Sequence, residues 1–311
     1  MNTMADLQTG KVIYRHLLSP LLEIFRIQPN NGGRFPAYQA GQNIDLSRDH
    51  CKLTKKIFDE RGNSKLIYDL DENGNPKLGR VTRTYSIASA PFETIKKKYL
   101  EFYVALDPIL LETPGRLTES LFHIDPEGDN HVGYSDKPSG DFTLEQRTAG
   151  FENVVMIGTG TGLAPLVSMT KQLHHESLDG KKHHTRYTLF HTNRTREELG
   201  YHSELLSIEA SHLFDFVYVP SVSRPTKNDI EDSSIGIGRV TNILREIFGM
   251  KLKSEHHQID PRLPKHISND KLLVRMETKR TVILSCGNHD MLKEVRSIAE
   301  PKGMRFEKED W

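Results

Sequence analysis

The sequence has few cysteines, no long hydrophobic run and no net charge, and each absence excludes a class of protein. Its two cysteines, Cys51 and Cys286, are too few for a disulfide-rich scaffold or a cysteine-ligated iron–sulfur cluster. Lys plus Arg and Asp plus Glu both number 42, so no overall field attracts nucleic acid. Apolar runs such as Val154–Ile157 are too short to span a bilayer, and the N-terminal segment lacks a signal-peptide core. We therefore expect a cytoplasmic protein with no nucleic-acid partner and no membrane insertion.

The pattern of apolar and polar residues changes near the middle of the chain, and this change predicts two domains. Its 311 residues exceed one compact core of ordinary size. Up to about residue 145, short apolar runs alternate with turn sequences such as PNNGG and PEGD, a pattern typical of an antiparallel barrel or sandwich. Within this half the polar segment Ser47–Arg80 predicts a hairpin-like insertion, in which Phe58 and residues 66–68 pair.

The second half alternates strands with helices. Strands are expected at VVMIG, RYTLFH, FDFVYVP and TVILSCG, with a short edge strand at MRFEKEDW. The intervening helices are expected at LAPLVSMTKQLHH, REELGYHSELLSI, VTNILREIF and DMLKEVRSIAEPKG. This order predicts a parallel sheet with right-handed crossovers. The charged segment 251–280 matches no unit of this kind.

A glycine- and threonine-rich loop follows the first strand of this half and opens a helix. It consists of Gly158, Thr159, Gly160, Thr161 and Gly162. Glycine lets the main chain approach a phosphate, and a helix N-terminus offers unpaired N–H groups. A tight turn without a ligand is the alternative. The strand–loop–helix context favours a dinucleotide site.

The ends of the next two strands favour NADP over NAD. A strand that binds NAD usually ends in an acid that holds the ribose 2′-hydroxyl, but here the strand runs into Asn193 and Arg194. The following strand ends at Ser223 and Arg224, and Arg239 opens the next helix. Guanidinium groups match phosphate oxygens, so these arginines are expected to clamp a 2′-phosphate, with three solvated surface arginines as the alternative.

A cysteine and a glycine, Cys286 and Gly287, end the fourth strand and are expected in the same crevice. Such a cysteine is a reactive thiol, a packing residue, or a small polarizable group beside a reacting ring. No partner for a thiolate is recognisable nearby in the sequence, so we favour the third role.

In the first half, the motif RTYS comprises Arg83, Thr84, Tyr85 and Ser86. Alternation along a strand places Arg83 and Tyr85 on one face, and Thr84 and Ser86 on the other. An arginine, an aromatic ring and two hydroxyls suit a ligand with a phosphate, a ring and a polar edge; an ordinary half-exposed strand is an equal alternative. The later sequence GRLTESL is a loop entering a short helix, again suited to phosphate oxygens.

Together these motifs resemble the ferredoxin–NADP(+) reductase family over most of the chain and in the same order. RTYS resembles its flavin motif, GRLT its pyrophosphate loop, GTGTGLAP its NADP loop, and HTNR, VSR with GR, and CGNHDM its later segments. The terminal Trp311 is similar to the bacterial branch, in which the chain ends on an aromatic near the flavin. The resemblance implies an antiparallel β-barrel FAD-binding domain at 1–150, followed by an α/β Rossmann-like NADP(H)-binding domain at 151–311.

The resemblance also implies the site residues. Ser86, near flavin N5, and Cys286, beside the nicotinamide, would be catalytic. The implied FAD-binding set is Arg83, Thr84, Tyr85, Ser86, Tyr103, Val104, Ala105, Leu106, Arg116, Leu117, Thr118, Thr161 and Trp311. The implied NADP-binding set is Gly158, Thr159, Gly160, Thr161, Gly162, Asn193, Arg194, Ser223, Arg224, Arg239, Cys286 and Gly287.

The activity implied by the resemblance is electron transfer between NADPH and a one-electron carrier, by hydride transfer to flavin N5. The partner would be an acidic redox protein, ferredoxin or flavodoxin, for which the basic cluster Lys96–Lys98 is suited, and the chain would act as a monomer. A reductase component serving an oxygenase or haem protein, and a non-catalytic module on the same fold, stay open. The insertion at 47–80 is longer than the family pattern, and Asp310 stands where another aromatic is expected.

The histidines do not predict a metal site. The adjacent pairs at 174–175, 183–184 and 256–257 would point in different directions on a helix, and neither HExxH nor a zinc-type Cys/His spacing is present. A nucleophile-elbow motif for Ser-His-Asp hydrolysis is also missing.

Overall fold

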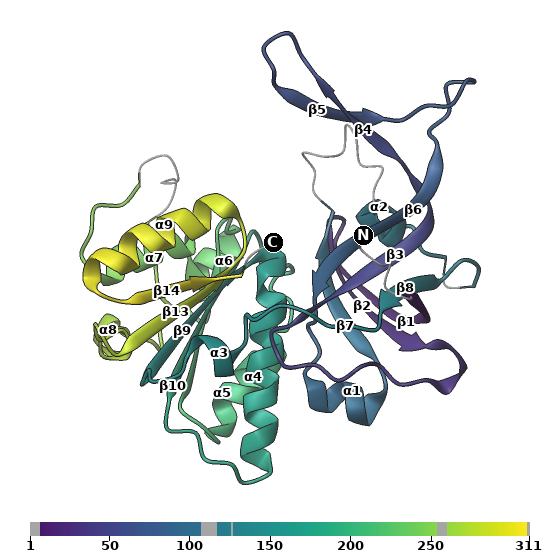
Figure 1. The fold of residues 1–311 in the computed structure, drawn as a ribbon. Helices are drawn as coiled ribbons and strands as arrows, with labels where there is room; N and C mark the ends of the chain where they lie inside the picture. Colours follow the sequence, from purple (N-terminus) through teal and green to yellow (C-terminus); the bar gives the residue numbers. More distant parts are fainter. Residues whose placement is uncertain (1–6, 107–116, 126, 254–259, 310–311) are drawn as a thin grey trace. The chain divides into compact units, whose positions relative to one another are not determined.

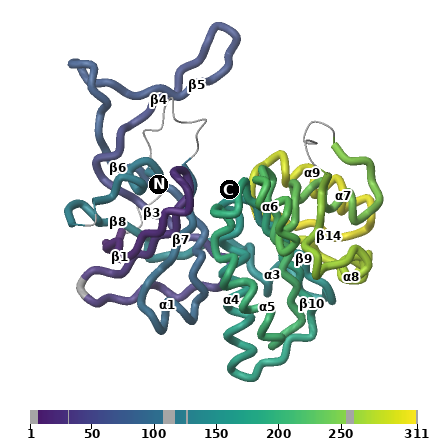
Figure 2. The backbone as a smooth tube through the Cα atoms, turned by 180° about the vertical axis from the view of Figure 1, so that it is seen from behind, coloured from purple at the N-terminus to yellow at the C-terminus, as the bar shows by residue number. Residues whose placement is uncertain are grey.

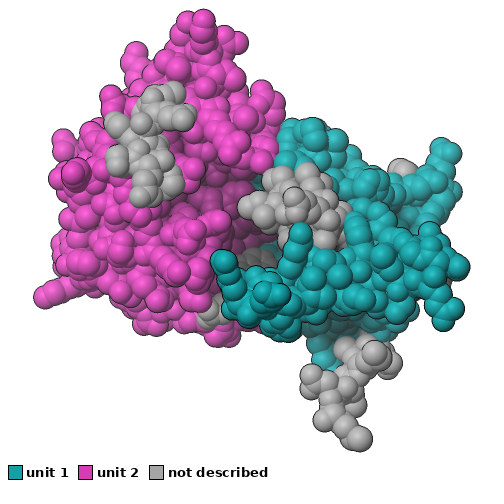
Figure 3. Space-filling model, turned by 90° about the horizontal axis from the view of Figure 1, so that it is seen from above, with its two compact units in different colours: residues 1–38, 43–87, 93–139 teal, residues 39–42, 88–92, 140–311 magenta. Residues whose placement is uncertain are grey.

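The computed structural model describes residues 7–106, 117–125, 127–253 and 260–309 and divides into two compact units. Unit 1 comprises Met1–Tyr38, Asn43–Ile87 and Glu93–Ser139. Unit 2 comprises Gln39–Gln42, Ala88–Phe92 and Gly140–Trp311 (Figure 3). Each unit has a hydrophobic core of its own. No helix in the described ranges is long and apolar enough to cross a membrane.

Unit 1 is built on a six-stranded antiparallel sheet with the order β6-β3-β8-β1-β2-β7 (Figure 1). Its strands are β1 (Leu7–Ser19), β2 (Leu22–Pro29), β3 (Asn43–Lys52), β6 (Leu78–Ser86), β7 (Leu100–Ala105) and β8 (His131–Ser135). The short helices α1 (Pro91–Lys97) and α2 (Leu117–Phe122) flank β7 in the chain. The expected antiparallel β architecture is confirmed.

Alternating side chains build the core of this sheet. Phe25 of β2 stacks on Phe102 of β7 with ring centroids 5.2 Å apart. Ile44 and Leu46 of β3 are fully buried in the same cluster. Removing each such side chain from water stabilises the fold by about 1.5–3 kcal/mol, which fixes the register of the strands.

The segment between β3 and β6 forms an arm. Here β4 (Thr54–Phe58) and β5 (Ser64–Tyr68) pair as a separate two-stranded sheet, which projects from the rest of unit 1 (Figures 1 and 2). A hairpin is therefore present in this insertion as expected, but its register differs from the expected one, because residues 66–68 pair with Lys56, Lys55 and Thr54, and Phe58 pairs with Ser64. The Asp59 carboxylate orders its turn by accepting the N–H groups of Arg61 and Asn63.

Unit 2 is a parallel sheet of six strands with the order β12-β11-β10-β9-β13-β14. The strands are β9 (Asn153–Thr159), β10 (Arg186–Asn193), β11 (Phe216–Val222), β12 (Gly236–Ile237), β13 (Thr281–Cys286) and β14 (Arg305–Lys308). The helices are α3 (Leu144–Arg147), α4 (Leu163–Leu178), α5 (His202–Ser211), α6 (Lys227–Glu231), α7 (Val240–Ile247), α8 (Asn269–Arg275) and α9 (His289–Ala299). The expected Rossmann-like α/β architecture is confirmed.

Helices cover both faces of this sheet, which explains why its central strands β9, β10, β11 and β13 are buried at almost every position. Helices α4 and α5 pack on β9 and β11. Helices α7 and α9 bury their apolar sides on the same sheet in the main core of unit 2, which includes Val155, Val219, Ile243 and Val295. The carboxyl ends of β9, β10, β11 and β13 consequently meet at one edge of the unit.

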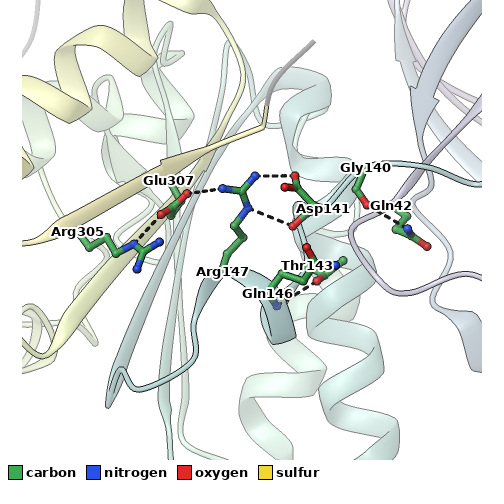
Figure 4. A network of polar contacts seen from close by, with 8 residues as sticks. All are labelled: Gln42, Gly140, Asp141, Thr143, Gln146, Arg147, Arg305 and Glu307. Carbon is green, nitrogen blue, oxygen red and sulfur yellow. Dashed lines mark hydrogen bonds and ion pairs between the residues drawn. The ribbon is translucent and has the colours of Figure 1, made fainter.

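A polar network joins residues 140–147 to the edge strand of unit 2 (Figure 4). Arg147 donates to the carboxylate of Asp141 at 2.5 Å and to that of Glu307 on β14 at 2.7 Å. Arg305 pairs with the same Glu307 carboxylate at 2.6 Å. Residues 140–150, assigned to the first domain from sequence, therefore pack with the α/β unit.

One expected helix is shorter than the sequence pattern indicated. The pattern extends over 196–208, but α5 begins only at His202. Tyr201 adopts the left-handed conformation, with φ of 63°, and breaks the helix there. The preceding residues form a loop that is held by the Glu198 side chain, as described below.

Candidate functional site

The GTGTG loop joins β9 to α4 with an open surface on one side and tight packing on the other. Gly160 adopts a left-handed conformation with φ of 55°, and among the described residues no atom beyond its two chain neighbours lies within 4 Å of where its Cβ would stand. A Cβ on Gly162 would instead overlap the carbonyl group of Cys286. The loop therefore packs main chain against main chain on the end of β13, while its outer side is free to receive a ligand.

The end of β13 holds a buried hydrogen bond that sequence reasoning missed. The Cys286 thiol, fully buried, donates to the carboxylate Oε2 of Glu309 at 2.8 Å. Glu309 follows β14 and donates its N–H to the Ser285 carbonyl at 3.2 Å. The two residues are 23 positions apart and meet only because β14 pairs with β13. The contact could have been predicted only from the knowledge that β13 and β14 are neighbouring strands.

This geometry bears on the three roles considered for Cys286. A carboxylate faces the thiol, so an anionic sulfur would be opposed by like charge. The arrangement speaks against a nucleophilic thiolate and fits a buried, oriented thiol. Gly287 follows directly, at the junction of β13 with the N-cap of α9.

The predicted arginine clamp splits into two groups. Arg194 forms a bidentate ion pair with Glu198, with nitrogen–oxygen distances of 2.9 and 2.6 Å. Arg224 and Arg239 have exposed side chains, and within the described part of the chain neither forms an ion pair. Only the latter two present uncommitted guanidinium groups.

Main-chain hydrogen bonds bring these positions together at the ends of β10 and β11. The Arg224 N–H donates to the Arg194 carbonyl at 2.8 Å, and the Ser223 N–H donates to the Asn193 carbonyl at 2.9 Å. The Gly238 N–H donates to the Val222 carbonyl at 2.9 Å, which places Arg239 beside the same strand end. All members of the predicted clamp thus share one edge of unit 2.

In unit 1, the RTYS motif ends β6. Tyr85 packs on the core, and its hydroxyl lies 2.8 Å from the Thr118 hydroxyl at the start of α2. Burial raises the pKa of Tyr85 to about 12, so its phenol stays neutral at physiological pH. Thr84 points to the opposite face, where it donates to the Asp45 carboxylate at 2.6 Å.

The remaining predicted flavin ligands are distributed around this point. Arg83 is exposed, and its guanidinium donates to the Thr82 carbonyl at 2.7 Å. Ser86 is buried at the end of β6, and Leu117 is buried in the core beneath α2. Strands β6 and β7 contact one another, which brings the strand carrying Tyr103, Val104 and Ala105, followed by Leu106, beside the motif. Arg116 and Trp311 lie outside the described residues.

Comparisons with known proteins agree with this architecture. Residues 156–297 match the family model described as the oxidoreductase NAD-binding domain. The chain is 29% identical over 215 residues to the ferredoxin–NADP reductase of Azotobacter vinelandii, covering 64% of this chain and 72% of that protein.

Solved structures show the same fold over nearly the whole chain. A ferredoxin NADP+ reductase from Neisseria gonorrhoeae with bound FAD and NADP aligns with a TM-score of 0.58 at 19% identity, over 98% of this chain and 99% of that one. A flavohemoglobin from Malassezia yamatoensis with bound FAD and haem aligns with a TM-score of 0.60 at 14% identity, over 97% of this chain but 60% of that one. The comparisons support the family resemblance that the order of motifs indicated.

Proposed function

We propose that this chain, as a member of the ferredoxin–NADP(+) reductase family, is an FAD-dependent oxidoreductase that transfers electrons between NADPH and a one-electron carrier, ferredoxin or flavodoxin. The observation that carries the proposal is the edge of unit 2, where an open glycine loop follows β9 and two uncommitted arginines follow β11 and β12 of the same sheet. This combination suits a nucleotide with both a pyrophosphate and a further phosphate.

The residues at this edge fit NADP(H). The space above Gly160 admits phosphate oxygens to the main chain of the loop from Gly158 to Gly162, at the N-terminus of a 16-residue helix. Arg224 and Arg239 would hold the 2′-phosphate, with Ser223 beside them. Cys286 and Gly287 would adjoin the nicotinamide, since Cys286 packs against the glycine loop.

The residues of unit 1 fit FAD. Tyr85 offers an aromatic ring that is only partly buried, and Arg83 offers a guanidinium that no carboxylate engages within the described residues. Leu117 and Thr118 start the helix beside them. When bound, FAD supplies a carrier that accepts electrons in pairs and releases them singly.

The chain's own residues would bind and position the reacting groups. Ser86 would present its hydroxyl at the end of β6, and Cys286 would present a thiol whose orientation is set by Glu309. A neutral Tyr85 phenol, fixed by Thr118, would hold its ring against the flavin without adding charge. Such positioning has a large effect on the rate, because a displacement of the reacting groups by about 1 Å slows the reaction by a factor on the order of a hundred.

Spectroscopy of the purified protein tests the proposal. We expect a yellow protein whose visible absorbance is bleached by NADPH under anaerobic conditions, and from which heat or acid releases FAD. Finding FMN, or no flavin, would contradict the cofactor assignment. A non-catalytic module on the same fold would not be bleached by NADPH.

A reductase component that serves an oxygenase or a haem protein is the second candidate. The likeness to the flavohemoglobin, of which this chain spans 60%, favours it. Parallel assays with ferredoxin, flavodoxin and a haem acceptor separate the two functions. Fast reduction of the haem acceptor alone would favour the second.

A further inference from the structure

The ion pair between Arg194 and Glu198 is asymmetric. The Glu198 side chain is 5% exposed, whereas that of Arg194 is 33% exposed. The carboxylate is therefore buried, and the guanidinium is the partner that reaches solvent. If Arg194 turned toward a ligand, this buried carboxylate would give up both of its hydrogen bonds to the guanidinium, which is unfavourable.

Glu198 is held in place through its main chain and its neighbour. The Asn193 side-chain amide donates to the Glu198 carbonyl at 2.6 Å, and the Gly200 N–H donates to the same carbonyl at 2.8 Å. The next residue, Leu199, belongs to a buried apolar cluster with Val222 and Ile235. These contacts hold the main chain of Glu198, so the carboxylate could follow the guanidinium outward only by rotation of its own side chain.

The other two arginines at this edge differ in this respect. Arg224 and Arg239 are exposed and have no carboxylate partner in the parts of the chain that the structure describes. A phosphate bound at the ends of β10 and β11 would engage these two at little cost. It would have to displace Glu198 to engage the third.

Building on the proposed NADP(H) function, we propose that Glu198 determines specificity by competing with the nucleotide 2′-phosphate for the guanidinium of Arg194. The 2′-phosphate is then bound by Arg224 and Arg239 alone, because Arg194 stays paired with Glu198. The preference for the phosphorylated nucleotide is accordingly smaller than three arginines would give. Removing the carboxylate charge, while keeping the shape of the side chain, releases Arg194 to the phosphate.

The test is binding of 2′,5′-ADP and of 5′-AMP to the holoprotein, by titration calorimetry. Glu198→Gln is expected to bind 2′,5′-ADP about three- to tenfold more tightly than the unmodified protein, with unchanged 5′-AMP affinity. Glu197→Gln is the matched control: it removes the same charge at the neighbouring exposed position, so it reports any long-range electrostatic gain. Adding Arg194→Gln to Glu198→Gln should abolish the gain.

Each outcome decides. Weaker or unchanged 2′,5′-ADP binding by a folded Glu198→Gln protein overturns the proposal, because Glu198 would then orient Arg194 for the phosphate or play no part. If Glu198→Gln does not fold, the double variant Arg194→Gln with Glu198→Gln, which leaves no buried charge uncompensated, decides: the proposal expects a loss under about threefold relative to the unmodified protein, against tenfold or more for Arg224→Ala. An unmodified protein that does not bind 2′,5′-ADP would refute the NADP(H) function itself.

Discussion

Buried polar side chains in unit 2 meet in pairs that cross between neighbouring strands. The Thr192 and Ser221 hydroxyls lie 2.6 Å apart, and His191 Nδ1 lies 2.9 Å from the Tyr218 hydroxyl. Burying such groups is tolerated only where each finds a partner. The buried pairs therefore stabilise the fold. The exposed arginines contribute nothing of this kind and keep their guanidinium groups available for a ligand.

Arg224 is the residue whose loss should discriminate most clearly between the two nucleotides. Arg224→Ala removes a charge-assisted hydrogen bond to the 2′-phosphate, so we expect kcat/KM for NADPH to fall about tenfold or more, with kcat/KM for NADH nearly unchanged. Steady-state assays with both nucleotides measure this. Lys182→Ala, a change at an exposed cation before β10, should alter neither value. Equal losses with both nucleotides would contradict the assignment.

The residues at the proposed hydride path should act on rate rather than on binding. We expect Ser86→Val and Cys286→Leu to slow the reduction of the flavin by NADPH about a hundredfold, because each displaces a reacting group, while both cofactors still bind. Cys286→Ser keeps a donor toward Glu309 and should slow it less. Stopped-flow absorbance follows the bleaching, and wild-type rates in both Ser86→Val and Cys286→Leu would remove these residues from the path.

His191 should make the stability of unit 2 depend on pH. Burial, with a smaller effect from His202, lowers the pKa of His191 to about 3. The unfolded chain takes up a proton near pH 6.5, which the folded protein refuses until about pH 3. This contribution is therefore full above about pH 6.5 and declines as the pH falls, by up to about 1.4 kcal/mol per unit.

Hydrogen exchange of the β10 amides measures this stability in unit 2 alone. His191→Leu should flatten the pH dependence between about pH 6.5 and 5, whereas the exposed His184→Gln should keep the slope of the unmodified protein. An unchanged slope in His191→Leu would show that another group dominates.

At the scale of elements, the arm formed by β4 and β5 stands apart from the rest of unit 1. Phe58 is 66% exposed and Ile57 41% exposed, so its strands bury little apolar surface. The ladder between β3 and β6 ends at Lys52 and Leu78, just before the arm begins. The arm is thus an appendage to a complete sheet.

Deleting the arm should leave the flavin site intact. We expect a variant in which residues 54–76 are replaced by Asn-Gly to keep its full flavin content and to lose less than about 1 kcal/mol of stability, since few buried contacts are removed. Flavin absorbance per chain and thermal unfolding measure both quantities. Loss of flavin on deletion would mean that the arm supports the site.

The elements also mark what the sequence could and could not predict. Strands β11 and β13 are buried at every position, and such continuous apolar runs are readable without a structure. The extent of α5 was not readable, because Glu198 pairs with Arg194 and Tyr201 breaks the helix. Arg194 and Glu198 stand four residues apart, but both precede α5, so the helical i,i+4 rule does not account for that ion pair. The pairing of Cys286 with Glu309 depended on which strands are neighbours, and local patterns carry no such information.

In the molecule as a whole, acidic and basic residues are equal in number, but they are not evenly distributed over the surface. Acidic and basic residues are equal at 42 each, yet Lys96, Lys97 and Lys98 lie together and exposed at the end of α1. Lys97 is partly committed to Glu93, at 3.2 Å. A local patch of this kind attracts an opposite charge over about one Debye length, even though the molecule carries no net field.

If the proposed carrier is acidic, reversing this patch should slow its reduction without affecting the nucleotide reaction. We expect Lys96→Glu together with Lys98→Glu to lower kcat/KM for ferredoxin about tenfold at low ionic strength, because steering of the carrier becomes repulsion. Raising the salt toward 1 M should shrink the difference, since the screening length falls to about 3 Å. NADPH oxidation by ferricyanide, a small acceptor that needs no docking surface, serves as the control and should keep most of its rate. If ferredoxin reduction is equally fast in both proteins at low salt, the carrier docks elsewhere, and the flavin and nucleotide assignments stand unaffected.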